Sequence, residues 1–176
     1  NREPFDNLAS YAEKYGQDLE KVMDIYVERI SKGELLPIIH INELILYLIS
    51  GKERGHTACG VELAQNYDIV SGKVYPCADL PSCQSIGEID QKGHLRLEEY
   101  NLNSLVSYKE WLGCHKCGIH AYCGGRCPIQ FLAGTRERTH QYCQLMRLHV
   151  GIVQERIEEI ASSLRKNRIS LQDIYD

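Results

Sequence analysis

Half of the chain's eight cysteines stand in one short run, and this run constrains the fold more than any other feature. Between Cys114 and Cys127 the sequence reads CHKCGIHAYCGGRC, a C-x2-C-x5-C-x3-C spacing that Pro128 closes. A C-x2-C pair can place two thiolates on one metal, and the two glycines before Arg126 let the backbone wrap tightly around a bulky ligand. The run therefore predicts a segment that holds metal or iron–sulfur clusters.

The cysteines outside this run are numerous enough to complete a second site. They are Cys59, Cys77, Cys83 and Cys143. Eight thiolates suffice for two four-thiolate sites with none left over. In the bacterial ferredoxin run, which also ends in C-x3-C-P, the last cysteine ligates the other of two clusters. This precedent indicates that Cys127 serves a different site from its sequence neighbours.

Four disulfides are the alternative use of eight cysteines. The cysteine content is below the roughly 8–10% typical of disulfide scaffolds, and the chain is much longer than the small secreted domains that need such bridges. Residues 1–4 lack the apolar core of a secretory signal. Clustered C-x2-C spacing in such a chain favours metal or redox chemistry over disulfides.

Composition argues against two classes of partner. A formal net charge of −4 gives no electrostatic basis for binding nucleic acid. No segment approaches the roughly 20 apolar residues that span a bilayer, so we expect no membrane association and a cytoplasmic location.

The 176 residues allow one domain with a proper core, or a small domain with helical appendages. Because no initiating methionine is present, we expect the chain to be part of a longer protein.

The first fifty residues are expected to be helical. Apolar side chains recur on one face of a helix that we expect Asp18 to cap and Gly33 to end; they are Leu19, Val22, Met23, Tyr26 and Ile30. A second helix at residues 38–49 stops before Gly51 and is apolar nearly all round. Such a helix needs cover on more than one side, so we infer a neighbouring part of a larger protein.

The middle of the chain has β-favouring character. Two such runs are separated by Ser71 and Gly72, which predicts a β-hairpin that ends at Cys77. Chain reversal at this turn would bring Cys77 back toward Cys59. A further short strand is expected near residues 94–97.

A long helix is expected at the C-terminal end, from about Gln141 to Arg165, with a helical turn at residues 108–112 before the cysteine run. Cys143 opens this long helix in the prediction. Exposed amides at a helix N-terminus stabilise a thiolate, which favours Cys143 as a ligand. The fold class expected is α+β, a small hairpin-containing cluster domain flanked by N-terminal and C-terminal helices.

The complete cysteine spacing resembles the seven-cysteine signature of the SPASM domain. The matching parts are C-x12-G-x4-C from Cys59 to Cys77, the four-cysteine run, and the last cysteine at Cys143. SPASM domains follow the catalytic barrel in radical S-adenosylmethionine enzymes that modify peptides and proteins, including makers of ribosomal peptide products. The resemblance implies three parts: residues 1–55 as the connection from a barrel, 56–145 as the auxiliary-cluster domain, and 146–176 as a C-terminal helix and tail.

The resemblance also implies two auxiliary 4Fe–4S clusters. It assigns Cys59, Cys77 and Cys127 to the first cluster, and Cys114, Cys117, Cys123 and Cys143 to the second. Many relatives supply a fourth ligand to the first cluster from a cysteine that precedes the counterpart of Cys59, but residues 52–58 contain none. Cys83 is the spare thiol and the favoured fourth ligand. Otherwise the first cluster has an open iron where a substrate thiolate or amide could dock.

The chain contains no C-x3-C-x2-C motif, so we do not expect it to cleave S-adenosylmethionine by itself. In a full-length enzyme the resemblance implies electron relay, substrate positioning, or both, with S-adenosylmethionine bound on the missing barrel. The expected partners are that barrel, a peptide or protein substrate, and a reductant such as ferredoxin or flavodoxin.

Two other functions compete with this interpretation. A structural zinc module for protein contacts would use the same thiolates, although its sites more often combine paired C-x2-C steps. Zinc could also replace the clusters in protein prepared in air. A free-standing electron carrier of ferredoxin type is the third alternative, and the long helices and the uncovered apolar segment argue against it.

Overall fold

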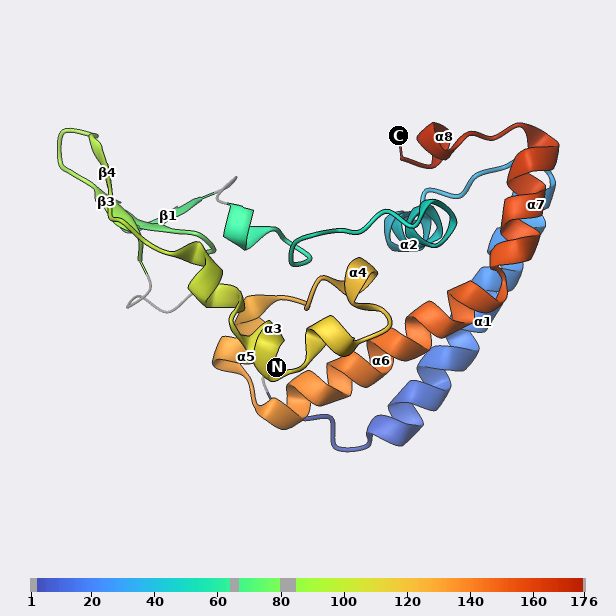
Figure 1. The fold of residues 1–176 in the computed structure, drawn as a ribbon, viewed down its shortest axis with the longest axis horizontal. Coiled ribbons are helices and arrows are strands. Elements are labelled where there is room, and N and C mark those ends of the chain that lie inside the picture. Colours follow the sequence, from blue (N-terminus) through green and yellow to red (C-terminus); the bar gives the residue numbers. More distant parts are fainter. Residues whose placement is uncertain (1–2, 64–66, 80–84, 176) are drawn as a thin grey trace. The chain divides into compact units, whose positions relative to one another are not determined.

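The computed structural model describes residues 3–63, 67–79 and 85–175, and the chain divides into two compact units (Figure 1). The first, which we call the helical unit, contains Glu3–Glu53 and Arg136–Asp176. The second, which we call the cysteine unit, contains Arg54–Thr135. The N-terminal and C-terminal helices, expected as two separate parts, therefore belong to one unit.

The helical unit is built on a long helix that packs beside the C-terminal helices. Its elements are α1 (Leu8–Ser31), α2 (Ile39–Ser50), α6 (Arg136–Glu155), α7 (Ile157–Asn167) and α8 (Leu171–Tyr175). Helix α1 lies along α6 and α7, while α2 contacts α6, α7 and α8 (Figure 1). Met23, Tyr26 and Ile30 of α1 are fully buried in this core, and the Tyr26 hydroxyl donates a 2.9 Å hydrogen bond to Asn42 Oδ1.

The start of α1 corrects the prediction for Asp18. The helix begins at Leu8, where the side chain of Asn7 accepts a hydrogen bond from the Ser10 amide. Asp18 lies inside the helix on its exposed face, where it pairs with Lys14 and Lys21 at 3.1 and 3.2 Å. The prediction was wrong because an aspartate one helical turn from two lysines is accommodated within a helix as well as at its start.

Helix α2 confirms its predicted bounds, since it ends at Ser50 and is followed by Gly51 in the left-handed conformation. Its side chains Ile41, Leu44 and Ile45 are buried, whereas Ile39 is 69% exposed. The chain's own helices α6, α7 and α8 pack against α2.

The long C-terminal helix begins earlier than predicted and is interrupted. Helix α6 starts at Arg136, and the chain leaves helical geometry at Arg156 before α7 begins. Cys143 therefore does not open the helix, and the prediction about its position was wrong. Terminal amides are confined to the first turn, so they do not explain why a thiolate at Cys143 would be stabilised.

The cysteine unit contains an antiparallel sheet in the order β1-β2-β3-β4. Its strands are β1 (Asp68–Val70), β2 (Lys73–Tyr75), β3 (Gly87–Ile89) and β4 (Leu95–Leu97). The predicted hairpin is confirmed, with Ser71 and Gly72 both at positive φ in the turn between β1 and β2. The strand expected near residue 95 is also confirmed, whereas β3 was not predicted.

The other regular elements among the described residues of the cysteine unit are short helices. They are η1 (Val61–Leu63), η3 (Leu102–Val106), α3 (Tyr108–Trp111), η4 (Cys114–Lys116), α4 (His120–Cys123) and α5 (Pro128–Ala133). The helical turn expected at residues 108–112 is α3. Helices and an antiparallel sheet occur together, as the α+β prediction states. In the ranges that the structure describes, no helix has the length and apolar character needed to cross a membrane.

Candidate metal centre

Three cysteines from distant parts of the sequence line one open pocket of the cysteine unit. The pocket is lined by Cys59, Val61, Cys77, Leu105, Cys127, Pro128 and Ile129. Cys59 precedes η1, Cys77 follows β2, and Cys127 directly precedes α5. The structure thus brings together the three cysteines that the resemblance assigns to the first cluster.

The local fold explains how these cysteines reach the pocket. Tyr75 and Leu105 form a small buried core beneath it, and Cys77 and Ile129 pack against this core. Pro128 occupies the first turn of α5, and Cys127 before it is extended, with φ −80° and ψ 124°. A residue before proline favours this extended conformation, so the Cys-Pro pair sets the direction in which the chain enters α5.

The three thiols lie close enough to influence one another. No disulfide joins Cys59, Cys77 or Cys127 to another described cysteine. Burial raises the pKa of the Cys77 thiol, and negative charge on Asp79, Cys127 and Cys59 raises it further. Three thiolates in one pocket repel one another, so binding a cationic group here would stabilise the charged form of all three.

The donor set at this pocket fits an iron–sulfur cluster in its chemistry. The side chains that line the pocket offer only thiol sulfur as a ligand, and soft thiolate ligands select iron–sulfur clusters, zinc or copper(I). No group of three His, Cys, Asp or Glu within residues 3–63, 67–79 and 85–175 is arranged to hold a metal ion. In a 4Fe–4S cluster each thiolate binds a different iron, so the ligands surround a volume instead of meeting at one point.

The cysteines assigned to the second cluster are divided between the two units. Cys114 begins η4, Cys117 follows it with its amide donating to the Cys114 carbonyl at 2.9 Å, and Cys123 ends α4. Cys143 lies on α6 in the helical unit. Cys83, the favoured fourth ligand of the first cluster, lies outside the described residues.

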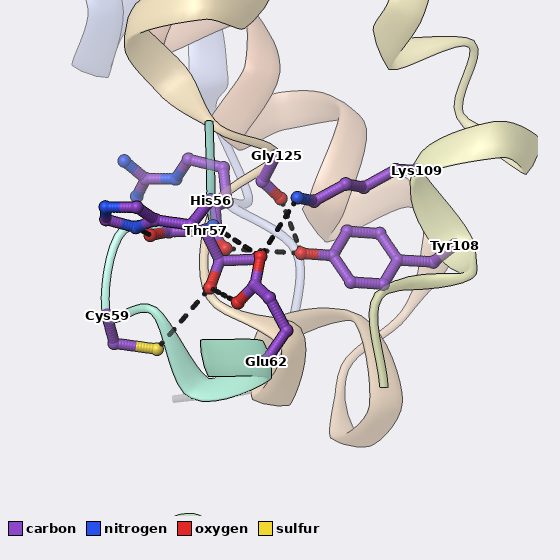
Figure 2. A network of polar contacts seen from close by, with 8 residues as sticks. His56, Thr57, Cys59, Glu62, Tyr108, Lys109 and Gly125 are labelled. Carbon is purple, nitrogen blue, oxygen red and sulfur yellow. Dashed lines mark hydrogen bonds and ion pairs between the residues drawn. The ribbon is translucent and has the colours of Figure 1, made fainter. Parts of the chain in front are cut away.

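Tyr108 lies near cysteines of both sets, and the sequence did not single it out. It is 3% exposed, its ring stacks on Phe131 at 4.8 Å, and its hydroxyl donates to the carbonyl oxygen of Gly125 at 2.7 Å (Figure 2). Burial raises the pKa of Tyr108 well above its ordinary value. Negative charge on Cys114, Cys127, Glu62 and Cys123 raises this pKa further. The hydroxyl therefore stays protonated and donates to the backbone between Cys123 and Cys127.

At two positions of the cysteine run, neighbouring atoms lie so close to the backbone that only glycine fits. Gly124 has φ +63°, and a Cβ atom there would lie 1.9 Å from the carbonyl oxygen of His56. Gly125 has φ +91°, and its Cβ would lie 2.8 Å from Lys109 Cε. The segment between Cys123 and Cys127 can close against these neighbours only because neither position carries a side chain.

A buried network of polar groups supports the loop that carries Cys59 (Figure 2). The fully buried Thr57 donates to Glu62 through its amide at 2.7 Å and its hydroxyl at 2.5 Å. Lys109 Nζ contacts Glu62 at 3.2 Å, and Thr57 Oγ1 lies 3.8 Å from Cys59 Sγ. Burial opposes ionisation of Glu62, but hydrogen bonds from Thr57, from its own backbone amide and from Lys109 prevail and lower its pKa.

No local pattern in the sequence could have revealed this network, because Glu62 and Lys109 are 47 positions apart. Thr57 and Glu62 are five positions apart, with Glu62 inside η1, so they do not have the spacing of a helix-capping pair either. Comparison of the chain with protein-family models, with curated proteins and with solved structures finds no match.

Proposed function

We propose that this chain is the SPASM-like auxiliary-cluster part of a radical S-adenosylmethionine enzyme that modifies peptides or proteins. The observation that carries the proposal is the pocket shared by Cys59, Cys77 and Cys127. Cys123 stands only four positions before Cys127, yet it is not among the described residues that line the pocket. In a chain that binds two neighbouring clusters, the two cysteines of a C-x3-C motif are expected to bind different clusters.

Seven cysteines have assigned roles in this proposal. Cys59, Cys77 and Cys127 hold the first 4Fe–4S cluster, with Cys83 or a substrate group as the fourth ligand. Cys114, Cys117, Cys123 and Cys143 hold the second. Such clusters, when bound, supply one-electron transfer to or from a substrate.

The surrounding residues position these ligands. Val61, Leu105 and Ile129 give the open pocket apolar walls, and the hydrophobic surroundings of a cluster are one of the factors that tune its potential. Tyr108 fixes the backbone that connects the two sets of ligands. The barrel that binds S-adenosylmethionine, a peptide or protein substrate, and a ferredoxin or flavodoxin are the proposed cytoplasmic partners.

Metal analysis of anaerobically reconstituted protein tests this proposal. Two clusters require about eight iron and eight sulfide ions per chain, with a broad visible absorption band from thiolate-bound iron. About two zinc ions per chain and no sulfide, persisting after reconstitution, would instead support a structural zinc module.

The fourth ligand of the first cluster needs a separate variant. Loss of iron from one cluster in Cys83→Ser would identify Cys83 as that ligand. Full loading in Cys83→Ser, together with a change in the cluster's electron paramagnetic resonance spectrum on adding a thiol, would identify an open iron instead.

A further inference from the structure

We propose that the buried Glu62–Lys109 ion pair sets the reduction potential of the cluster held by Cys59, with Thr57 as the structural link between the pair and that ligand. This inference rests on the proposed function, because it assigns a role to residues around one of the proposed clusters. These are positioning and tuning residues, since none of them is proposed to ligate iron.

The geometry connects the ion pair to the ligand through a single hydroxyl group. Thr57 Oγ1 donates to Glu62 Oε2 at 2.5 Å and lies 3.8 Å from Cys59 Sγ. Lys109 Nζ contacts the other carboxylate oxygen, Oε1, at 3.2 Å. One hydroxyl group therefore separates the carboxylate from the sulfur, and the ammonium group contacts the carboxylate oxygen that does not accept from this hydroxyl (Figure 2).

Burial makes these charges effective over this distance. The side chains of Lys109 and Glu62 are only 19% and 8% exposed, and Thr57 is fully buried. Charges in such surroundings are screened far less than charges on the surface. By contrast, the pairs that Asp90 forms with His94 and Arg96 in the cysteine unit involve basic side chains that are 71% exposed.

The Thr57 hydroxyl has one proton to donate. Glu62 is ionised and accepts that proton at 2.5 Å, so the hydroxyl has no proton left to donate to the sulfur of Cys59, 3.8 Å away. A ligating thiolate has no proton, and the Thr57 hydroxyl then lies between two anions. The potential at Cys59 consequently depends on how well Lys109 neutralises Glu62.

The signs of the expected effects follow from charge. Reduction adds an electron to the cluster, so a nearby negative charge makes reduction harder and lowers the potential. Replacing Glu62 by neutral glutamine should raise the potential. Replacing Lys109 by methionine should lower it, because the carboxylate is then uncompensated. The double variant should lie between the two single variants.

Redox titration of the reconstituted full chain, monitored by electron paramagnetic resonance, measures both cluster potentials. The variants are Glu62→Gln, Lys109→Met, their combination, and Lys109→Arg, which keeps the charge and should keep the wild-type potential. The matched control is Glu110→Gln, because Glu110 is an exposed neighbour on α3 and undergoes the same change of charge. We expect opposite shifts in Glu62→Gln and Lys109→Met, both larger than the shift in the control.

The proposal requires that the change in reduction potential occurs in the cluster that Cys59 holds. The Cys59→Ser/Cys77→Ser variant should retain only the second cluster, and adding Glu62→Gln to it should leave that cluster's potential unchanged. Shifts of the same sign in the two single variants, or shifts no larger than in Glu110→Gln, would overturn the inference while leaving the proposed function intact. A wild-type chain that binds no cluster would overturn both. Should Glu62→Gln fail to fold, Lys109→Met against Lys109→Arg still decides the question.

Discussion

The hydroxyl of Tyr108 donates a 2.7 Å hydrogen bond to the carbonyl oxygen of Gly125 and approaches the carbonyl oxygen of Arg126 at 3.2 Å. Both carbonyl groups lie between Cys123 and Cys127, the two cysteines proposed to serve different clusters. One buried side chain on α3 therefore holds the backbone that sets the spacing between these two ligands.

Tyr108→Phe should destabilise the cysteine unit while leaving its ring packing intact. A buried hydrogen bond is lost and two carbonyl groups lose a donor, which costs about 1–3 kcal/mol. Trp111 is the chain's one tryptophan and packs on Phe131 at 5.5 Å, so its fluorescence during urea unfolding reports on this unit. Tyr67→Phe, at a residue that is 42% exposed, is the control. Equal urea midpoints for the two variants would show that the Tyr108 hydrogen bonds contribute nothing.

Gly124→Ala should impair cluster loading much more than Gly118→Ala. The new Cβ would meet the His56 carbonyl oxygen at 1.9 Å and would sit on a residue with φ +63°. At Gly118 nothing lies within 4 Å of the added atom. Iron per chain after reconstitution, compared between these two variants, measures the effect. If Gly124→Ala loads as fully as Gly118→Ala, the close approach of residue 56 to the cysteine run is not needed.

The helical unit should lose stability at high pH through Tyr26. Burial raises the pKa of Tyr26 from 10.0 to about 12, so the folded state keeps its proton when the unfolded chain has lost it. The stabilisation from the protonated hydroxyl is complete below pH 10 and is lost as the pH rises toward 12. The loss amounts to about 2–3 kcal/mol at the upper end.

Circular dichroism during urea unfolding at pH 9 and pH 11.5 checks this prediction. Tyr26→Phe removes the titrating group, so its stability should fall less between these pH values than that of the wild type. Tyr11→Phe, at a residue on the same helix that is 47% exposed, should behave as the wild type does. Identical pH dependence in all three proteins would contradict the assignment.

Removal of the clusters should disorder the cysteine unit more than the helical unit. The cysteine unit is made of short helices and three-residue strands, and its backbone converges on the proposed ligands. Metal binding contributes folding free energy in such small sites. The helical unit instead has a buried apolar core of its own. Anaerobic chelation should therefore change Trp111 fluorescence strongly and helical circular dichroism weakly, and unchanged Trp111 fluorescence would argue against clusters that organise the fold.

Local signals in the sequence predicted much of this fold. The left-handed position at Gly51 and the two-residue turn at Ser71 and Gly72 are set by the backbone preferences of the residues themselves, and both were predicted correctly. The starts of α1 and α6 were not predicted correctly. Asp18 resembles a cap but pairs with neighbouring lysines, and the charged residues before Gln141 form helix instead of loop.

The candidate site shows the same division between local and distant information. Spacing predicted that Cys59 and Cys77 would meet, because a hairpin reverses the chain between them. Spacing could not reveal the contact between Glu62 and Lys109 or the hydrogen bond from Tyr108, since both depend on how α3 packs against loops far from it in sequence. Polar contacts of this kind follow from tertiary packing and leave no periodic pattern.

The most direct test of two separate clusters is to count iron and sulfide in variants that each remove one set of ligands. We predict about eight iron and eight sulfide ions per chain in the wild type, and about four of each in both Cys59→Ser/Cys77→Ser and Cys114→Ser/Cys117→Ser. The two variants should retain clusters with different electron paramagnetic resonance spectra. Loss of all iron in both variants, or zinc without sulfide in the wild type, would contradict the assignment of Cys59, Cys77 and Cys127 to a cluster of their own.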